Sequence, residues 1–208
     1  HLMSRNLAYI VPVHNDAGSI AVVTETLKKQ LNARAGRHEI ILVENGSEDA
    51  SSSIVRGLSG EFGTVRVRAL SLTDRGLGYA LHAGIKAALE WADVEWLVLT
   101  ASDLPFGFSD LASFDAAIEA DPRLDIAIGS KAHLSNRDQW PLHRRIMGLV
   151  FLLIRRVILG TSPRDTQGSF FISRRVGLEI APKVQAKDFF YSTELVYHAE
   201  RGGFRPLE

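Results

Sequence analysis

Short apolar runs alternate along the chain with segments whose apolar residues recur every three or four positions. The runs predict five buried strands, and the helical spacing between them predicts four amphipathic helices. The strands are expected at 7–13, 39–43, 64–70, 95–100 and 124–129, and the helices at 19–32, 47–58, 78–91 and 108–120. Strands that alternate with helices through short links are typical of an α/β domain with a mostly parallel sheet and helices on both faces.

Ligands of such sheets bind beyond the carboxyl ends of the strands, so the loops at these ends are the informative ones. The loop after the second predicted strand, ENGSED, has two interpretations. In one, Gly46 makes a turn and Ser47 caps the following helix, with Asp49 in its first turn. In the other, Glu44 and Asn45 accept hydrogen bonds from the ribose or base of a nucleotide.

The loop after the first strand contains His14 and Asp16. An aromatic ring at this place stacks on a base, and a carboxylate bonds the polar edge of that base. The alternative is an Asx turn that caps the next helix.

Two further loops carry candidate phosphate and metal chemistry. Arg75 and Gly78 precede a helix amino terminus, which favours phosphate oxygens. The glycine pair does not fit the dinucleotide fingerprint, because its third glycine position is Leu81 and it follows the third strand rather than the first. Asp103, after the fourth strand, is either a hard ligand for Mg²⁺ or Mn²⁺ on a diphosphate or a helix-entry residue before Pro105.

A basic and apolar segment at 141–160 predicts a helix with arginines at 144, 145, 155 and 156. Its apolar stretch, 146–154, is too short to span a bilayer, which takes roughly 20 residues. An apolar helix flanked by arginines lies in a membrane interface, and the arginines bind phosphate. The alternative is a core helix with solvated arginines.

Composition narrows the class of protein. The length of 208 residues suggests one domain. The 24 lysines and arginines balance the 24 aspartates and glutamates, so no overall field favours nucleic acid. Without cysteine, disulfides and thiolate metal sites are excluded, which fits a reducing compartment.

Residues 1–3 look like a cloning remnant, which leaves 4–208 as the domain. The end of the chain at Glu208, just after a new strand begins, suggests a missing C-terminal segment.

Seven motifs, spread over about residues 7–204, together resemble the family 2 glycosyltransferases of the GT-A fold. They are VPVHND, VENGSED, GLGYALHAGIKAA, TASDLPF, IAIGSK, RDTQGSF and STELVYHAERGGF. Within that family they look most like the polyprenyl-phosphate hexose transferases, the dolichol-phosphate mannose and glucose synthases.

The resemblance implies roles for individual residues. The nucleoside would be held by His14, Asp16, Glu44 and Asn45, and the metal and diphosphate by Asp103, the second acid of the family's Asp-x-Asp motif. Asp165 and Gln167 of the Asp-Thr-Gln motif would lie near the sugar and acceptor as catalytic candidates, and Glu194 matches a late glutamate. We expect the acceptor phosphate at Lys131, Arg144 and Arg145, and Arg75 and Gly78 beside the sugar nucleotide.

These residues predict an enzyme that transfers a hexose, with inversion, from a GDP- or UDP-sugar to a polyprenyl phosphate. It would use Mg²⁺ or Mn²⁺, act in glycan or cell-wall biosynthesis, and lie peripherally on the cytoplasmic face of a membrane. Ala101 replaces the first acid of Asp-x-Asp, and Phe171 stands where the family has a lysine. These departures motivate an alternative, a degenerate member that binds a nucleotide or partner without catalysis. A nucleotidyltransferase ranks last, because 14–19 offers one glycine and no lysine or arginine.

Overall fold

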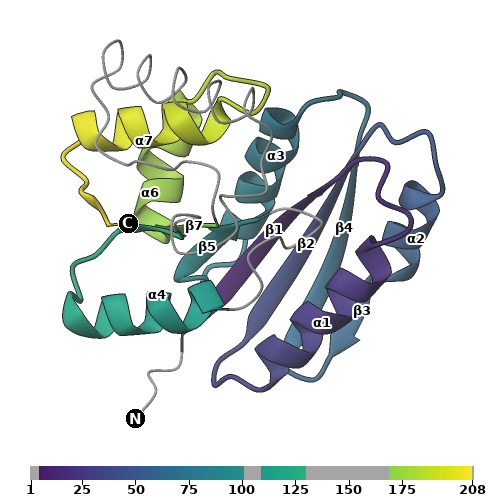
Figure 1. Ribbon diagram of the computed structural model, residues 1–208, viewed down its shortest axis with the longest axis horizontal. Helices are drawn as coiled ribbons and strands as arrows, with labels where there is room; N and C mark the ends of the chain where they lie inside the picture. Colours follow the sequence, from purple (N-terminus) through teal and green to yellow (C-terminus); the bar gives the residue numbers. More distant parts are fainter. Residues whose placement is uncertain (1–4, 101–108, 130–168, 208) are drawn as a thin grey trace, which may run out of the picture.

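The computed structural model describes residues 5–100, 109–129 and 169–207. Their strands form one eight-stranded sheet in the order β3-β4-β2-β1-β5-β7-β6-β8 (Figure 1). The strands are β1 Leu7–Val13, β2 His38–Asn45, β3 Gly60–Phe62, β4 Val65–Leu72, β5 Trp96–Leu99, β6 Ile126–Ile128, β7 Phe170–Ser173 and β8 Pro206–Leu207.

The centre of the sheet is parallel, as the sequence predicted. β1 pairs in parallel with β2 on one side and with β5 on the other, and β2 pairs in parallel with β4. Every residue of β1 and β2 is buried. The whole of β1 and residues 40–43 of β2 are continuous apolar runs, because helices cover both faces of these strands.

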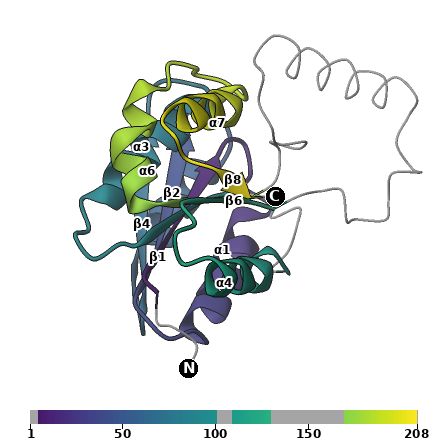
Figure 2. The ribbon, with the colours of Figure 1, turned by 90° about the vertical axis from the view of Figure 1, so that its left-hand side faces the viewer.

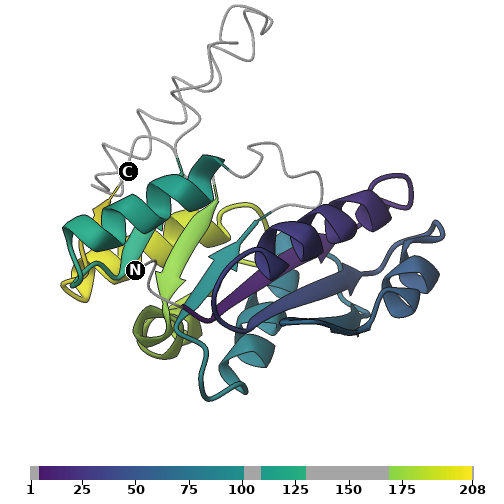
Figure 3. The same cartoon turned by 90° about the horizontal axis from the view of Figure 1, so that it is seen from below.

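Two layers of helices enclose the sheet (Figures 2 and 3). One face is covered by α1 Ile20–Asn32, α2 Ser51–Gly57 and α4 Ser109–Ala120. The other is covered by α3 Leu77–Leu89, α6 Arg174–Glu179, the 3-10 turn η4 Ala181–Lys183 and α7 Tyr191–Arg201.

Close packing on each face explains the residue choices. Phe114 of α4 stacks on Phe171 of β7 with 4.2 Å between ring centroids, and meets Trp96 of β5 edge to face. On the opposite face, Gly84 lets α3 approach β1, because a Cβ there would collide with the side chain of Ile10. Gly84 therefore permits a close helix–sheet contact.

The structure differs from the expected elements in three places. β3 forms an antiparallel edge with β4 that the apolar pattern did not indicate. β7 lies between β5 and β6 and is antiparallel to both, so the fifth predicted strand does not neighbour the fourth. The prediction that Ser47 caps the second helix is wrong. The chain turns over residues 46–50, so α2 begins only at Ser51 and its N-cap is Ala50.

The segment 141–160 lies outside the described residues. In the ranges that are described, no helix is both long and apolar enough to cross a bilayer.

Candidate functional site

The loops after β1 and β2 begin at the same level of the sheet, because Val13 is in register with Glu44. The ring of His14 lies against the second loop, with its Nδ1 3.1 Å from the carbonyl oxygen of Asn45. The carboxyl ends of β1, β2 and β4 point to one side of the molecule, where these loops meet (Figure 1). The side chains expected at the nucleoside are therefore brought together.

Asn15 binds the two loops to each other. Its φ of 53° is left-handed, a conformation that asparagine tolerates better than most residues. Its backbone N–H donates to Ser47 Oγ at 3.0 Å, and its Oδ1 accepts from the N–H of Glu48 at 2.8 Å. Ser47 thus bridges two loops instead of capping a helix.

Asp16 and Asp49 reinforce the same junction. The N–H of Asp16 donates to Ser51 Oγ at 2.8 Å, and the Oδ2 of Asp16 accepts from the N–H of His14 at 3.3 Å. Asp49 accepts from the N–H groups of Ala17 and Ser51. Hydrogen bonds from Ser51 lower the pKa of the Asp49 carboxyl, so it serves these turns as an anion.

Glu44 and Asn45 are both buried at the end of β2, each with 4% of its surface exposed. Glu44 Oε1 accepts from the backbone N–H of Ser47, which closes the turn around Gly46. Asn45 Nδ2 donates to the carbonyl oxygen of Gly76 at 2.9 Å, while its Oδ1 is buried and has no partner among the described residues. Burying an acceptor without a donor costs free energy. Asn45 Oδ1 is therefore the atom of this turn that could accept a hydrogen bond from a ligand N–H or O–H.

The loop between β4 and α3 completes this edge. Arg75 Nη2 forms an exposed ion pair with Glu48 Oε1 at 2.6 Å. Gly46, with a φ of 71°, lies beneath Arg75: a Cβ at Gly46 would come within 2.9 Å of Arg75 Cγ. The N–H of Gly78 donates to the carbonyl oxygen of Lys187, so this donor of the helix start is used within the protein.

The remaining predicted site residues lie outside the described residues. These are Asp103, Lys131, Arg144, Arg145, Asp165 and Gln167. Among the described residues, no group of three or more histidine, aspartate or glutamate side chains is arranged to hold a metal ion. A metal site at Asp103 stays a prediction.

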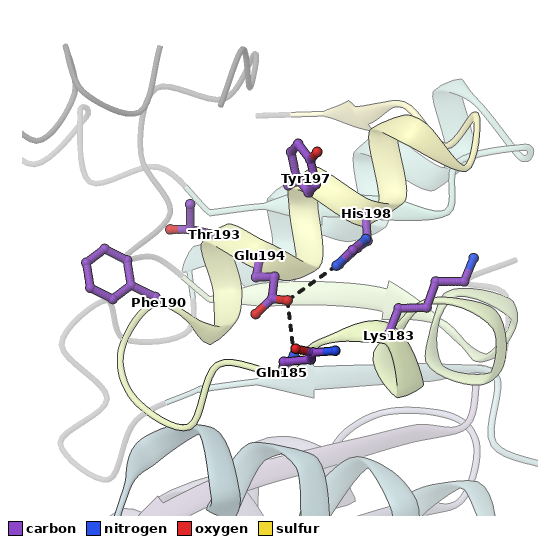
Figure 4. A pocket seen from close by; sticks show the side chains of 7 residues that line it. All are labelled: Lys183, Gln185, Phe190, Thr193, Glu194, Tyr197 and His198. Atoms are coloured by element: carbon purple, nitrogen blue, oxygen red, sulfur yellow. Dashed lines mark hydrogen bonds and ion pairs between the residues drawn. The ribbon is translucent and has the colours of Figure 1, made fainter. Parts of the chain in front are cut away.

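A pocket of about 450 Å³ lies between η4 and α7, and the sequence interpretation assigned it no role (Figure 4). Its lining combines aromatic rings with titratable groups: Lys183, Gln185, Phe190, Thr193, Glu194, Tyr197 and His198. Sequence reasoning also missed Ser51 and Lys187. The only local signal for Lys187 was the pair Gly76 and Gly78, which indicates a close backbone approach but does not identify the approaching segment.

The fold is the GT-A fold of nucleotide-diphospho-sugar glycosyltransferases. The structure is similar over 98% of its length to glucosyl-3-phosphoglycerate synthase from Mycobacterium tuberculosis in complex with UDP, with a TM-score of 0.65 and 14% identity over 69% of that chain. It is also similar over 99% of its length to a mannosyltransferase from Pyrobaculum calidifontis in complex with GDP-Man and Mn²⁺. There the TM-score is 0.62 and the identity 20%, over 55% of that chain.

The chain belongs to the glycosyl transferase family 2, whose model matches residues 9–179. It is 30% identical over 210 residues to a dolichyl-phosphate beta-glucosyltransferase of Drosophila melanogaster and 25% identical over 212 residues to the Homo sapiens enzyme of that description. Each alignment covers 95% of this chain, but only 63% and 64% of the respective relatives. The glycosyltransferase AglD of Haloferax volcanii is 28% identical over 97% of this chain and 32% of its own. The chain thus spans under two thirds of the length of these relatives.

Proposed function

We propose that this chain transfers a hexose from a nucleoside diphosphate sugar to a polyprenyl phosphate. The observation that carries the proposal is Asn45 Oδ1, a buried acceptor with no partner among the described residues, at the edge where the β1, β2 and β4 loops meet. In parallel α/β sheets, this edge is where nucleotides bind. The dolichyl-phosphate beta-glucosyltransferases among the relatives support the lipid phosphate as acceptor.

In this proposal, the described loops bind different parts of the donor. The ring of His14 offers a face for the base, while Asn45 Oδ1 accepts an N–H or O–H from the nucleoside. Asp16 and Glu44 give the turns their shape, and Arg75 is placed to attract the diphosphate. Most of these bonds exist before any ligand arrives, so little ordering accompanies binding.

In the reaction, an oxygen of the acceptor phosphate forms a bond to the anomeric carbon of the sugar. The bond from that carbon to the diphosphate breaks, and the nucleoside diphosphate leaves with the electron pair. Attack opposite the departing group inverts the anomeric centre. The acceptor is already anionic at neutral pH, so it needs little or no general base.

Several assignments of the proposal fall on residues outside the described ranges. Asp165 and Gln167 would meet the sugar and acceptor, and Lys131, Arg144 and Arg145 the acceptor phosphate at the cytoplasmic membrane face. Mg²⁺ or Mn²⁺ on Asp103 would neutralise charge on the departing diphosphate. The Mn²⁺ in the similar mannosyltransferase structure supports this cofactor.

The direct test supplies the protein, in its full-length form, with UDP- and GDP-hexoses, a polyprenyl phosphate and Mg²⁺ or Mn²⁺, and looks for a lipid-linked sugar. We expect one donor to give product. The proposal is wrong if no donor yields a lipid-linked sugar.

A paired substitution tests the observation that carries the proposal. Asn45→Ala removes the open acceptor and should weaken UDP or GDP binding about tenfold or more, the effect of losing a buried hydrogen bond. The matched control is Asn32→Ala, which removes the Oδ1 that accepts from Thr64 at the opposite edge of the sheet. The control should lose stability and keep its nucleotide affinity.

A binding protein without catalysis is the alternative that Ala101 favours, because the first acid of Asp-x-Asp is absent. Asp103→Asn distinguishes the two functions. It should abolish turnover in an enzyme, whereas a noncatalytic binder would keep its affinity for its partner.

A further inference from the structure

Glu194 of α7 uses its carboxylate to hold a loop. Its Oε1 accepts from the backbone N–H of Gln185 at 3.1 Å, and its Oε2 accepts from that of Ala186 at 2.7 Å. Nε2 of His198, one helical turn further on, lies 3.3 Å from Oε1 (Figure 4). Burial opposes the charge, but these three donors outweigh it and lower the pKa of Glu194. Glu194 is therefore an anion with both oxygens occupied.

The loop that Glu194 holds, residues 185–187, packs against the amino terminus of α3. The carbonyl oxygen of Lys187 accepts from the N–H of Gly78 at 3.0 Å. A Cβ at Gly78 would come within 2.5 Å of the carbonyl oxygen of Ala186, and a Cβ at Gly76 would collide with the carbonyl oxygen of Lys187. Both neighbours are backbone atoms, which cannot rotate away. The two segments can approach this closely because both positions of the turn are glycine.

The same glycine turn holds Asn45. Because Gly76 supplies the carbonyl oxygen that accepts from Asn45 Nδ2, it sets the orientation of the amide, whose Oδ1 has no partner in the described part of the chain. A continuous series of contacts thus runs from Glu194 through residues 185–187 and the turn at Gly76 to the open oxygen of Asn45.

From this series of contacts we infer that Glu194 is a positioning residue for the nucleotide pocket. It fixes the loop 185–187, which fixes the turn before α3, which orients Asn45. The inference rests on the proposed function, because it assigns Glu194 to the same nucleotide site. With both oxygens engaged in holding the loop, Glu194 does not act as a general base.

The rest of α7 does not depend on this carboxylate. Its side chains Leu195, Val196 and Ala199 are fully buried, and Tyr191 is nearly so. Their packing keeps the helix on the sheet when Glu194 is replaced. The effect of a substitution should therefore concentrate on the loop and the pocket.

The experiment compares Glu194→Ala and Glu194→Gln with a control, Ser173→Ala. The control removes the hydroxyl that caps α6 by accepting from the N–H of Val176. For each variant, calorimetry gives the Kd for UDP and GDP, and urea titration gives the free energy of unfolding. Glu194→Ala should raise the nucleotide Kd about tenfold, as expected when charge-assisted hydrogen bonds that orient a pocket are lost. Glu194→Gln keeps one acceptor oxygen and should raise it less.

Ser173→Ala should reduce stability and leave the Kd unchanged. The inference is overturned if Glu194→Ala reduces stability as the control does but binds nucleotide with the wild-type Kd. As a second variant, Gly78→Ala displaces the same loop from the other side, and it should weaken binding in the same direction.

Hydrogen exchange of the Gly78 amide separates this inference from the proposed function. The amide donates to Lys187, so Glu194→Ala should speed its exchange in the absence of nucleotide, whereas Ser173→Ala should not. A wild type that binds neither UDP nor GDP, combined with faster exchange in Glu194→Ala, refutes the proposed function and supports the role of Glu194 in holding the loop. Unchanged exchange refutes the role of Glu194.

Discussion

The two edges of the parallel sheet are both rich in polar side chains, but they use them differently. At the amino edge, Asn6 donates to the carbonyl oxygen of Asp93 and accepts from the N–H of Arg37, and its own N–H donates to Glu95. At the carboxyl edge, Asn45 also donates to a neighbouring loop, but its buried Oδ1 has no partner among the described residues. Two equally polar asparagines therefore differ in what they leave for a ligand: Asn6 closes a junction between loops, whereas Asn45 is the residue proposed to bind the nucleoside.

The comparison predicts that substitutions at the amino edge change stability, whereas those at the carboxyl edge change nucleotide binding.

The largest expected effect is on acid stability and comes from His38 at the amino edge. His38 is 2% exposed, and its Nδ1 accepts from the N–H of Leu7. Burial, with a smaller contribution from Arg34, lowers its pKa from 6.5 to about 4. Between these values the unfolded chain binds a proton that the folded protein rejects, so stability falls as pH decreases from 6.5 towards 4. The loss is on the order of 3 kcal/mol.

Urea titrations at pH 7.5 and pH 4 measure this loss, with His38→Asn as the reference because its amide oxygen can accept from Leu7. The variant should lose less stability over the same interval. Equal losses in both proteins would assign the acid sensitivity to other groups.

The next effect concerns Arg34 and Asp115, which join α4 to the end of α1. Two bonds of 2.7 Å connect the guanidinium to both carboxylate oxygens, and each side chain is about one-fifth exposed or less. The hydrogen bonds that Arg34 donates to Asp115 raise the pKa of Arg34; burial opposes this shift and the charge of Asp115 adds to it, so the pair is ionic. Asp115→Asn should lower the free energy of unfolding by about 2 kcal/mol. Nucleotide affinity should not change. A higher Kd for UDP or GDP would contradict the prediction that substitutions at the amino edge affect only stability.

Ser51→Ala tests the carboxyl edge directly. Ser51 is fully buried, and its Oγ accepts from the N–H of Asp16. The loss of this bond should cost about 1 kcal/mol of stability. Unlike Asn32→Ala at the amino edge, it should also weaken UDP or GDP binding, because it frees the loop of His14. Calorimetry on both variants gives the comparison, and equal Kd values would contradict it.

The smallest effect on stability is expected for Arg75→Ala. Its ion pair with Glu48 joins side chains that are 60% and 71% exposed, and such pairs contribute about 0.5 kcal/mol or less. Nucleotide binding should weaken and lose part of its salt dependence, because Arg75 is proposed to attract the diphosphate. Binding measured at two salt concentrations, with Arg75→Lys as the charge-conserving control, tests this.

Much of the architecture could be predicted because it follows from local patterns. The four parallel strands and their helices were expected within a few residues of their observed bounds, since apolar runs and helical spacing reflect burial on the two faces of the sheet. The strands β3 and β7 could not be placed in the same way. Their position depends on pairing with distant strands, and β7 enters between β5 and β6 from a much later part of the chain.

The candidate site was also predictable only in part. Loop position alone placed His14, Asp16, Glu44 and Asn45 at one edge, because parallel strands end at the same side. Which of their atoms remain open could not be predicted. Glu44 closes a turn by accepting from Ser47 at Oε1, and Asn45 donates to Gly76 while its Oδ1 has no partner among the described residues.

By itself, the sequence determined the order of the four parallel strands, the helices between them and the edge at which the polar loops gather, because these depend on hydrophobic periodicity and chain direction. Tertiary structure alone decided the partners. The carboxylate of Glu194 binds the N–H groups of residues 185 and 186, and the carbonyl of Lys187 accepts from Gly78, which lies more than a hundred residues earlier in the chain. These contacts form because α3 and α7 pack on the same face of the sheet, and the sequence around each residue does not identify its partner.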